Sequence, residues 1–134
     1  MKNKTKMRET GCPVAYGLDT FGDRWSFLIL RDMMIRDKKT YGELLEMEEE
    51  IATNVLADRL KQLEAADIIS KVRDPENRRS YIYSMTAKGY DLAPILTEIM
   101  VWSGEYDQRP FALRNVPDLI KKDRKGFLAK ISGG

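Results

Sequence analysis

The sequence contains no histidine and only one cysteine, Cys12. One chain therefore cannot assemble a zinc site of the usual Cys/His type. Catalysis by serine–histidine or cysteine–histidine pairs is excluded for the same reason. The phosphate-binding patterns G-x-x-x-x-G-K-[ST] and G-x-G-x-x-G are also missing. We expect no metal, no cofactor and no enzyme activity, because the many carboxylates form no pattern typical of catalysis.

Long apolar runs are missing as well. The apolar stretch Phe27–Leu30 is followed at once by Arg31 and Asp32, far short of the ~20 residues that cross a bilayer. The basic N-terminus has no apolar segment behind it, which argues against a signal peptide. A single cysteine cannot form an internal disulfide, so we expect a cytoplasmic protein without a membrane partner.

The composition is that of one globular domain, with 134 residues, 43% of them hydrophobic and 33% charged. The net charge of +2 hides an uneven distribution. Basic residues gather in 1–8, 71–79 and 121–130, and glutamates gather in 43–50. Basic patches of this kind suit an anionic partner such as nucleic acid, although they are more often solvated surface.

The first half of the chain predicts two successive helices. Pro13 fits the first position of a short helix that Gly22 ends. Residues 23–34 have apolar positions at helical spacing, and Asp23 is a candidate N-cap.

A helix-turn-helix pattern follows. Thr40 and Glu43 form a capping box for a short helix that ends near Met47. A longer helix is predicted over residues 52–66, with leucines at helical spacing on its inner face and polar residues opposite. A short helix, a tight connection and a longer helix are typical of this DNA-binding motif.

Beyond this helix the pattern changes to alternation. Residues 68–73 and 80–85 predict two strands, and residues 74–79 supply turn formers and charge. The expected hairpin with basic flanks is a wing.

The C-terminal third is predicted to be helical. Thr86 caps a long helix that Pro94 interrupts. The proline is expected either to kink this helix or to have its lost hydrogen bond replaced by a local adjustment. A last amphipathic helix is expected over residues 116–131. The fold class is thus α+β, mostly α: a winged helix-turn-helix with a two-stranded β-wing.

This combination of elements is suited to reading duplex DNA. The second helix of the motif enters the major groove, and the wing reaches phosphates or the minor groove. Arg59 lies on the flank of the helix, where a phosphate and an intramolecular partner are alternative contacts. The candidate DNA-binding residues are Thr40, Thr53, Asn54, Ala57, Asp58, Arg59, Lys61, Arg73, Asn77, Arg78 and Arg79.

Several segments of the chain carry a family resemblance, namely Cys12-Pro13-Val14, Gly22-Asp23-Arg24-Trp25, Ile29-Leu30-Arg31, Tyr41-Gly42-Glu43-Leu44, Leu56–Glu64, and Tyr81–Thr86 followed by Gly89, Leu92, Pro94 and Trp102. Together they resemble the HxlR family of bacterial winged helix-turn-helix regulators. The resemblance covers residues 11–103. Ala52 stands where the family tends to have a serine cap, and the chain from Ser103 onward lies outside the shared pattern.

The resemblance implies a homodimer that binds a pseudo-palindromic operator and regulates nearby genes, with repression favoured over activation. Family members dimerise through their first helix and their long C-terminal helix. The sequence agrees, because both helices carry more apolar residues than a small domain can cover. A C₂ dimer would place two recognition helices about one DNA turn (~34 Å) apart. The candidate interface residues are Tyr16, Leu18, Phe21, Ile95, Ile99 and Trp102.

Cys12 has two interpretations. It immediately precedes the helix that begins at Pro13, where the helix dipole favours a thiolate. Some family members sense oxidants or electrophiles through a cysteine at this position, and the resemblance carries this role to Cys12. The alternative is a small apolar residue packed in the dimer interface.

Two further functions stay open beside the dimeric regulator. One is a winged-helix module that binds a protein through the acidic run and the wing. The other is a regulator gated by a small-molecule effector, bound between the dimerisation helices and lined by Met33, Met34, Tyr90 and Trp102. The expected organisation is a basic flexible N-terminal arm over residues 1–10, a winged-helix DNA-binding and dimerisation domain over 11–103, and a helical extension over 104–134.

Overall fold

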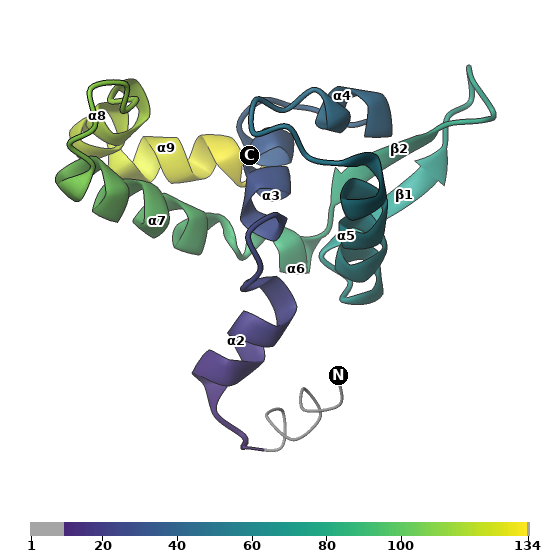
Figure 1. The fold of residues 1–134 in the computed structure, drawn as a ribbon, viewed down its shortest axis with the longest axis horizontal. Helices are drawn as coiled ribbons and strands as arrows, with labels where there is room; N and C mark the ends of the chain where they lie inside the picture. The colour runs from purple at the N-terminus through teal and green to yellow at the C-terminus, as the bar shows by residue number, and fades with distance from the viewer. Residues whose placement is uncertain (1–9, 134) are drawn as a thin grey trace.

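The computed structural model describes residues 10–133, so most of the arm expected over residues 1–10 lies outside the described residues. The described chain is mostly helical with one two-stranded antiparallel sheet (Figure 1). Its elements are, in order, α2 (Pro13–Phe21), α3 (Ser26–Met34), α4 (Tyr41–Leu45), α5 (Thr53–Ala65), β1 (Ile69–Arg73), β2 (Tyr81–Met85), α6 (Ala87–Tyr90), α7 (Ala93–Tyr106), α8 (Asn115–Lys122) and α9 (Arg124–Ile131).

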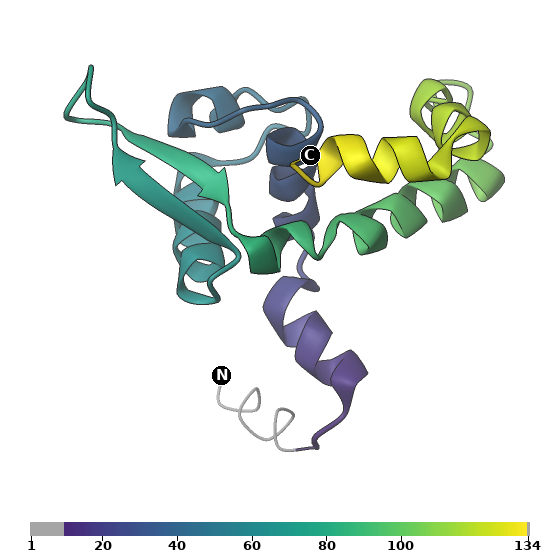
Figure 2. The same ribbon diagram turned by 180° about the vertical axis from the view of Figure 1, so that it is seen from behind.

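The elements form a winged-helix body with a helical extension on one side. α3, α4, α5 and the hairpin make up the body, and α7, α8 and α9 lie on the side away from the hairpin, while α2 projects from the body on its own (Figures 1 and 2). The predicted winged helix-turn-helix fold is confirmed. Among the described residues, no helix combines the length and apolar character needed to cross a bilayer.

One hydrophobic core holds the body together. Leu56, Leu60 and Leu63 of α5 are almost fully buried, which confirms the inner face predicted from their spacing. They pack with buried residues of α3, α4, the sheet and the connections on either side of α5, namely Ile29, Leu30, Met33, Leu44, Met47, Ile51, Ile68, Ile69 and Tyr83.

Side-chain caps set the starts of α3 and α4. Thr40 Oγ1 accepts from the Glu43 N–H, and Glu43 Oε1 accepts from the Thr40 N–H, both at 3.1 Å, which confirms the capping box. Asp23 accepts from the N–H groups of Trp25 and Ser26 at 2.9 and 3.0 Å, as an N-cap does. The regular part of α3 begins only at Ser26, because a turn separates it from Asp23.

The wing is a regular hairpin. β1 and β2 pair antiparallel, with Lys71 opposite Tyr83 and Arg73 opposite Tyr81. The connecting loop is closed by backbone bonds from Asp74 N–H to Ser80 O and from Ser80 N–H to Asn77 O.

The prediction of one long helix kinked at Pro94 is wrong. The chain forms α6, turns at Asp91 and Leu92, and starts α7 at Ala93. Pro94 therefore lies in the first turn of α7, where its missing N–H leaves no intrahelical bond unmade. The proline starts a helix here and does not bend one.

The last amphipathic segment is likewise two helices. Asp123 ends α8 and caps α9 by accepting from the Gly126 N–H at 3.0 Å. A Cβ at Gly126 would meet the Asp123 carboxylate at 2.2 Å, so a larger residue there would oblige the capping side chain to shift. Both helices fold back on α7 (Figure 2). The small second core buries Ala93, Ile120, Phe127 and Ile131.

Candidate nucleic-acid interface

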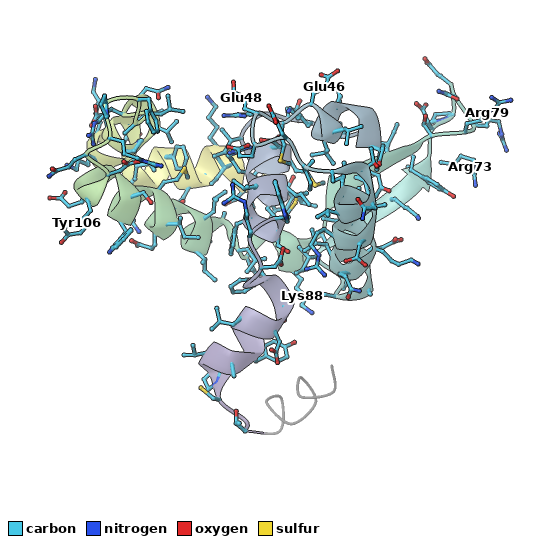
Figure 3. The ribbon with its side chains drawn as sticks, viewed as in Figure 1. Glu46, Glu48, Arg73, Arg79, Lys88 and Tyr106 are labelled. Atoms are coloured by element: carbon cyan, nitrogen blue, oxygen red, sulfur yellow. The ribbon has the colours of Figure 1, made fainter. Side chains whose placement is uncertain are left out.

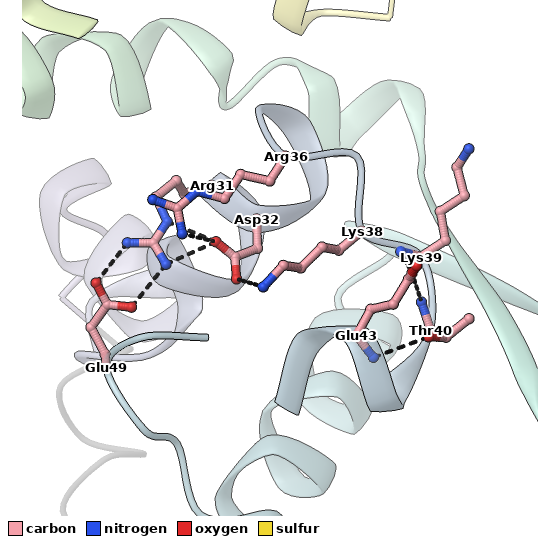
Figure 4. Close-up of polar contacts among 8 residues, drawn as sticks. All are labelled: Arg31, Asp32, Arg36, Lys38, Lys39, Thr40, Glu43 and Glu49. Atoms are coloured by element: carbon pink, nitrogen blue, oxygen red, sulfur yellow. Dashed lines mark hydrogen bonds and ion pairs between the residues drawn. The ribbon is translucent and has the colours of Figure 1, made fainter. Parts of the chain in front are cut away.

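The two helices of the motif are fixed by side chains at their connection. Tyr41 Oη donates to the Thr53 carbonyl at 3.0 Å, which ties the start of α4 to the start of α5. Arg31 of α3 makes two bonds, of 2.8 and 2.9 Å, to the carboxylate of Glu49 in the connection (Figure 4). These bonds hold the pKa of Glu49 at about 2, well below its ordinary value. The sequence reasoning missed both contacts, because neither follows from spacing.

Arg31 also belongs to a cluster around Asp32, whose side chain is fully buried. The Asp32 carboxylate accepts hydrogen bonds from side-chain nitrogens of Arg31 at 2.8 Å, Lys38 at 3.0 Å and Arg36 at 3.5 Å (Figure 4). The Arg31 pKa is raised, chiefly by its hydrogen bonds to Glu49. The cluster fixes the end of α3 and, through Glu49, the segment that leads into α5.

The outer face of α5 is available to a partner. Its predicted contact residues are all exposed. Among residues 10–133, the side chains of Asn54 and Lys61 make no hydrogen bond or ion pair, so their donors are free to contact base edges or phosphates. The exposed residues of this face are Thr53, Asn54, Ala57, Asp58 and Lys61.

Arg59 turns toward its own chain. Its Nη1 lies 2.9 Å from Asp23 Oδ1, and its Nη2 lies 3.4 Å from Asp58. Partial burial raises the pKa of Asp23, but hydrogen bonds from Ser26 and Trp25 and the charge of Arg59 outweigh burial and leave this pKa below its ordinary value. Of the two contacts considered for Arg59, the structure contains the intramolecular one.

Some cations of the wing are bound within the chain, and others have no partner among the described residues. The Arg73 guanidinium donates to Tyr81 Oη at 2.9 Å and lies 4.7 Å above the Tyr81 ring, and Lys71 lies 4.3 Å from the same ring. Arg78 and Arg79 are exposed, and neither side chain has a partner within the described part of the chain. Arg79 stands out from the hairpin in Figure 3.

A cleft of about 540 Å³ separates the start of α4 from the wing. Thr40 and Gly42 line it on one side, and Asn77, Arg79 and Tyr81 line it on the other. The cleft brings together predicted contact residues that are far apart in the sequence. Asn77 also fixes the loop, because its Oδ1 accepts from the Arg79 N–H at 3.2 Å.

Cys12 is exposed and stands at the N-cap of α2, where its side chain makes no capping bond. It lines a groove of about 760 Å³ between α2 and α5. Tyr16 belongs to the α2 side of this groove, and Arg59 and Gln62 belong to the α5 side. The only thiol of the chain therefore opens onto a groove that the recognition helix also lines.

Five of the six candidate interface residues are exposed apolar side chains. Tyr16 and Leu18 project from α2, and α7 carries a row formed by Ile95, Ile99 and Trp102. Phe21 differs, because it is half-buried and packs edge-on against Phe27, with 5.0 Å between ring centroids. Tyr106 continues the row on α7, 5.5 Å from Trp102.

The four residues expected around an effector do not share one site. Met33 is buried in the main core, and with Tyr90 it lines a cavity of only about 80 Å³. Trp102 lies in the exposed row on α7. Met34 packs between the two cores.

Comparison with known proteins assigns the chain to a family. The family model described as HxlR-like helix-turn-helix matches residues 20–110, which include α3 to α7. The chain belongs to the HxlR-like helix-turn-helix family. The resemblance inferred from the sequence motifs is thereby confirmed.

Named HxlR-like relatives are transcriptional regulators. The HTH-type transcriptional regulator sll1512 of Synechocystis sp. is 37% identical over 66% of each chain. The HTH-type transcriptional regulator YodB of Bacillus subtilis is 32% identical over 75% of this chain and 89% of its own length.

Solved structures agree with the HxlR-like assignment. The crystal structure of PA1607 matches with a TM-score of 0.71 and 32% identity, over 81% of this chain and 74% of that one. The redox regulator HypR in its oxidised form matches with a TM-score of 0.61 and 28% identity, over 70% of this chain and 96% of that one.

Proposed function

We propose that this protein is a sequence-specific DNA-binding repressor that acts as a homodimer on a pseudo-palindromic operator. The exposed outer face of α5, with its unpartnered Asn54 and Lys61, is the observation that carries the proposal. Family membership adds support, because helix-turn-helix regulators act on DNA. Repression fits a dimer that covers its operator and blocks access to it.

Contacts divide by role in this proposal. Asn54 reads a base edge, since an amide can both donate and accept in the major groove. Lys61, Arg78 and Arg79 neutralise phosphates of the DNA. The cleft between the start of α4 and the wing receives the sugar–phosphate backbone. Arg59 and Arg73 position their neighbours, because their guanidinium groups are bound within the chain.

The dimer is proposed from the exposed apolar rows of α2 and α7. Such rows are costly in a monomer, and contiguous apolar surface marks an interaction site. Two copies related by a C₂ axis would cover both rows and present two recognition helices to successive major grooves.

The experiment is a fluorescence-anisotropy titration with the DNA upstream of the protein's own gene and with a scrambled duplex, at two salt concentrations. Preference of at least ~10³ for the upstream duplex, together with a steep fall of affinity with salt, is the expected result. Equal and weak, salt-insensitive binding to both would favour the alternative, a module that binds a protein.

A response to oxidants or electrophiles through Cys12 is the second candidate function. The exposed thiol opens onto a groove shared with α5, so an adduct there would lie against the recognition helix. HypR is a redox regulator, and YodB of Bacillus subtilis has been solved in a quinone-bound form. With one cysteine in each chain, the product is an adduct, a mixed disulfide or a disulfide between subunits.

The Cys12 response is tested by titrating DNA with protein treated with diamide or with a quinone. Treatment should change the DNA affinity of the wild type and leave that of Cys12→Ser unchanged. An equal change in both proteins would rule out Cys12 as the sensor.

A further inference from the structure

A cavity outside the DNA-binding surface lies where α3, α7 and the start of α8 meet. Its volume is about 410 Å³, within the range of small-molecule sites. Most of its wall is apolar and comes from all three places, through Ile35, Ile99, Met100, Leu113 and Val116. Ile99 also belongs to the exposed row of α7. α8 lies beyond the residues that the family model matches, so the cavity is completed by a part of the chain outside the shared pattern.

Arg36, which lines this cavity, is the most weakly paired cation of its cluster. The cluster of Figure 4 joins Arg31, Arg36 and Lys38 to only two carboxylates, those of Asp32 and Glu49. Arg31 and Lys38 approach Asp32 closely, whereas Arg36 stays 3.5 Å away and is the most exposed of the three cations. Arg36 is therefore the surplus cation of the cluster.

Arg114 brings a second cation to the lining. Asp107 is the one acidic residue of the lining among those that the structure describes, and it feels the charge of Arg114. Its guanidinium donates to the carbonyl oxygens of Gly104 and Asp107 at 3.0 and 2.6 Å. The carboxylate of Asp107 is bound by Arg109, at 2.7 Å. No carboxylate forms an ion pair with Arg114 within residues 10–133, and carbonyl oxygens orient a guanidinium without cancelling its charge.

We propose that this cavity binds a small amphipathic anion, a carboxylate or sulfonate on an apolar ring or chain. The acid group lies between Arg36 and Arg114, and the apolar part lies against Ile35, Met100 and Val116. A neutral apolar molecule would bury the apolar wall but leave both cations without a counter-charge. A small hydrophilic anion would pair with the cations but leave the apolar wall exposed to water. Binding needs neither α5 nor the wing, so it stands or falls independently of the proposed DNA binding.

The test uses 8-anilinonaphthalene-1-sulfonate, whose fluorescence rises on transfer to an apolar site, with the full chain as it exists. Arg36→Gln and Arg114→Gln should each weaken the high-affinity binding about tenfold, the loss expected for one charge-assisted hydrogen bond. Arg78→Gln is the matched control, because it removes the same charge from the exposed wing and should leave the affinity unchanged.

Two further measurements separate the cavity from other apolar surface. The neutral probe N-phenyl-1-naphthylamine should bind the wild type and both cavity variants alike, since it makes no use of the arginines. Ala112→Trp, which fills the cavity from the loop before α8, should abolish the high-affinity phase for the sulfonate. Equal sulfonate affinities in wild type, Arg36→Gln and Arg114→Gln would overturn the proposal, as would full binding to Ala112→Trp.

Discussion

Asp32 shows at the scale of one residue how charge is used inside this fold. Its side chain is fully buried, yet it is surrounded by Arg31, Lys38 and Arg36. A buried carboxylate is tolerated when cations compensate it, and removing one member of such a group leaves the others unpaired.

The first prediction concerns this carboxylate. Asp32→Asn should destabilise the protein by about 2 kcal/mol, below the range for fully buried pairs because its partners are partly solvated. Urea unfolding followed by circular dichroism measures the loss. Arg36→Gln is the control and should cost less than ~0.5 kcal/mol, since its contact with Asp32 is long and exposed. Equal losses in the two variants would contradict the central position of Asp32.

Glu49 should make the stability of the fold depend on pH, and the direction of this dependence follows from its pKa. The folded-state pKa of about 2 is below the ordinary glutamate value of 4.5, chiefly because of the bonds from Arg31. The stabilisation is therefore fully present above pH 4.5 and is lost as the pH falls toward 2. We expect about 1 kcal/mol after allowance for solvent screening. Urea midpoints at pH 5.5 and 2.5 should differ more in the wild type than in Glu49→Gln, while the exposed Glu48→Gln should behave like the wild type.

At the scale of elements, the sequence predicts whatever depends on neighbouring residues. The capping box of α4 and the leucine stripe of α5 follow from spacings of three and four residues. The break before α7 does not, because a proline fits both a kinked helix and the first turn of a new one. Packing decides between them, and here α6 and α7 are separate helices.

The candidate site divides in the same way. The exposed face of α5 follows from periodicity, so all five of its predicted residues are exposed. The capture of Arg73 by Tyr81 depends on strand register, and that of Arg59 by Asp23 joins segments 36 residues apart. Neither contact is indicated by neighbouring residues. The sequence alone therefore places arginines that are bound within the chain and arginines without a partner in residues 10–133 in one set of candidate DNA contacts.

The recognition helix and the wing therefore should respond differently to substitution. Asn54→Ala should cost about 1–3 kcal/mol of binding to the preferred duplex and little on a scrambled one, because a base contact carries specificity. Arg79→Ala should weaken both duplexes alike and reduce the dependence of log affinity on log salt by about one. Anisotropy titrations at several salt concentrations measure both effects. Lys125→Ala, an exposed residue of α9, is the control and should change neither.

At the scale of the whole molecule, the proposed contact with DNA and the proposed contact with a second copy lie on different parts of the HxlR-like chain. The proposed DNA-binding surface lies on α5 and the wing, and the exposed row of α7 lies on the other side of the body (Figure 1). α8 and α9 cover a different part of α7, including Ala93 and Met100 in the second core. The extension therefore leaves Ile95 and Trp102 uncovered and Ile99 exposed at the edge of the cavity beside α8, which keeps this row available to a second copy.

The last prediction follows from that separation. Trp102→Glu places a charge in the centre of the row and should convert a dimer into a monomer in sedimentation-velocity experiments, without change in the circular dichroism spectrum. DNA affinity should fall at least ~100-fold, because the two half-sites are no longer bound by linked modules. Leu119→Glu is the matched control, since Leu119 is an exposed apolar residue of α8 outside the row. A dimeric Trp102→Glu would place the subunit contact elsewhere, and a monomer with undiminished DNA affinity would separate dimerisation from operator binding.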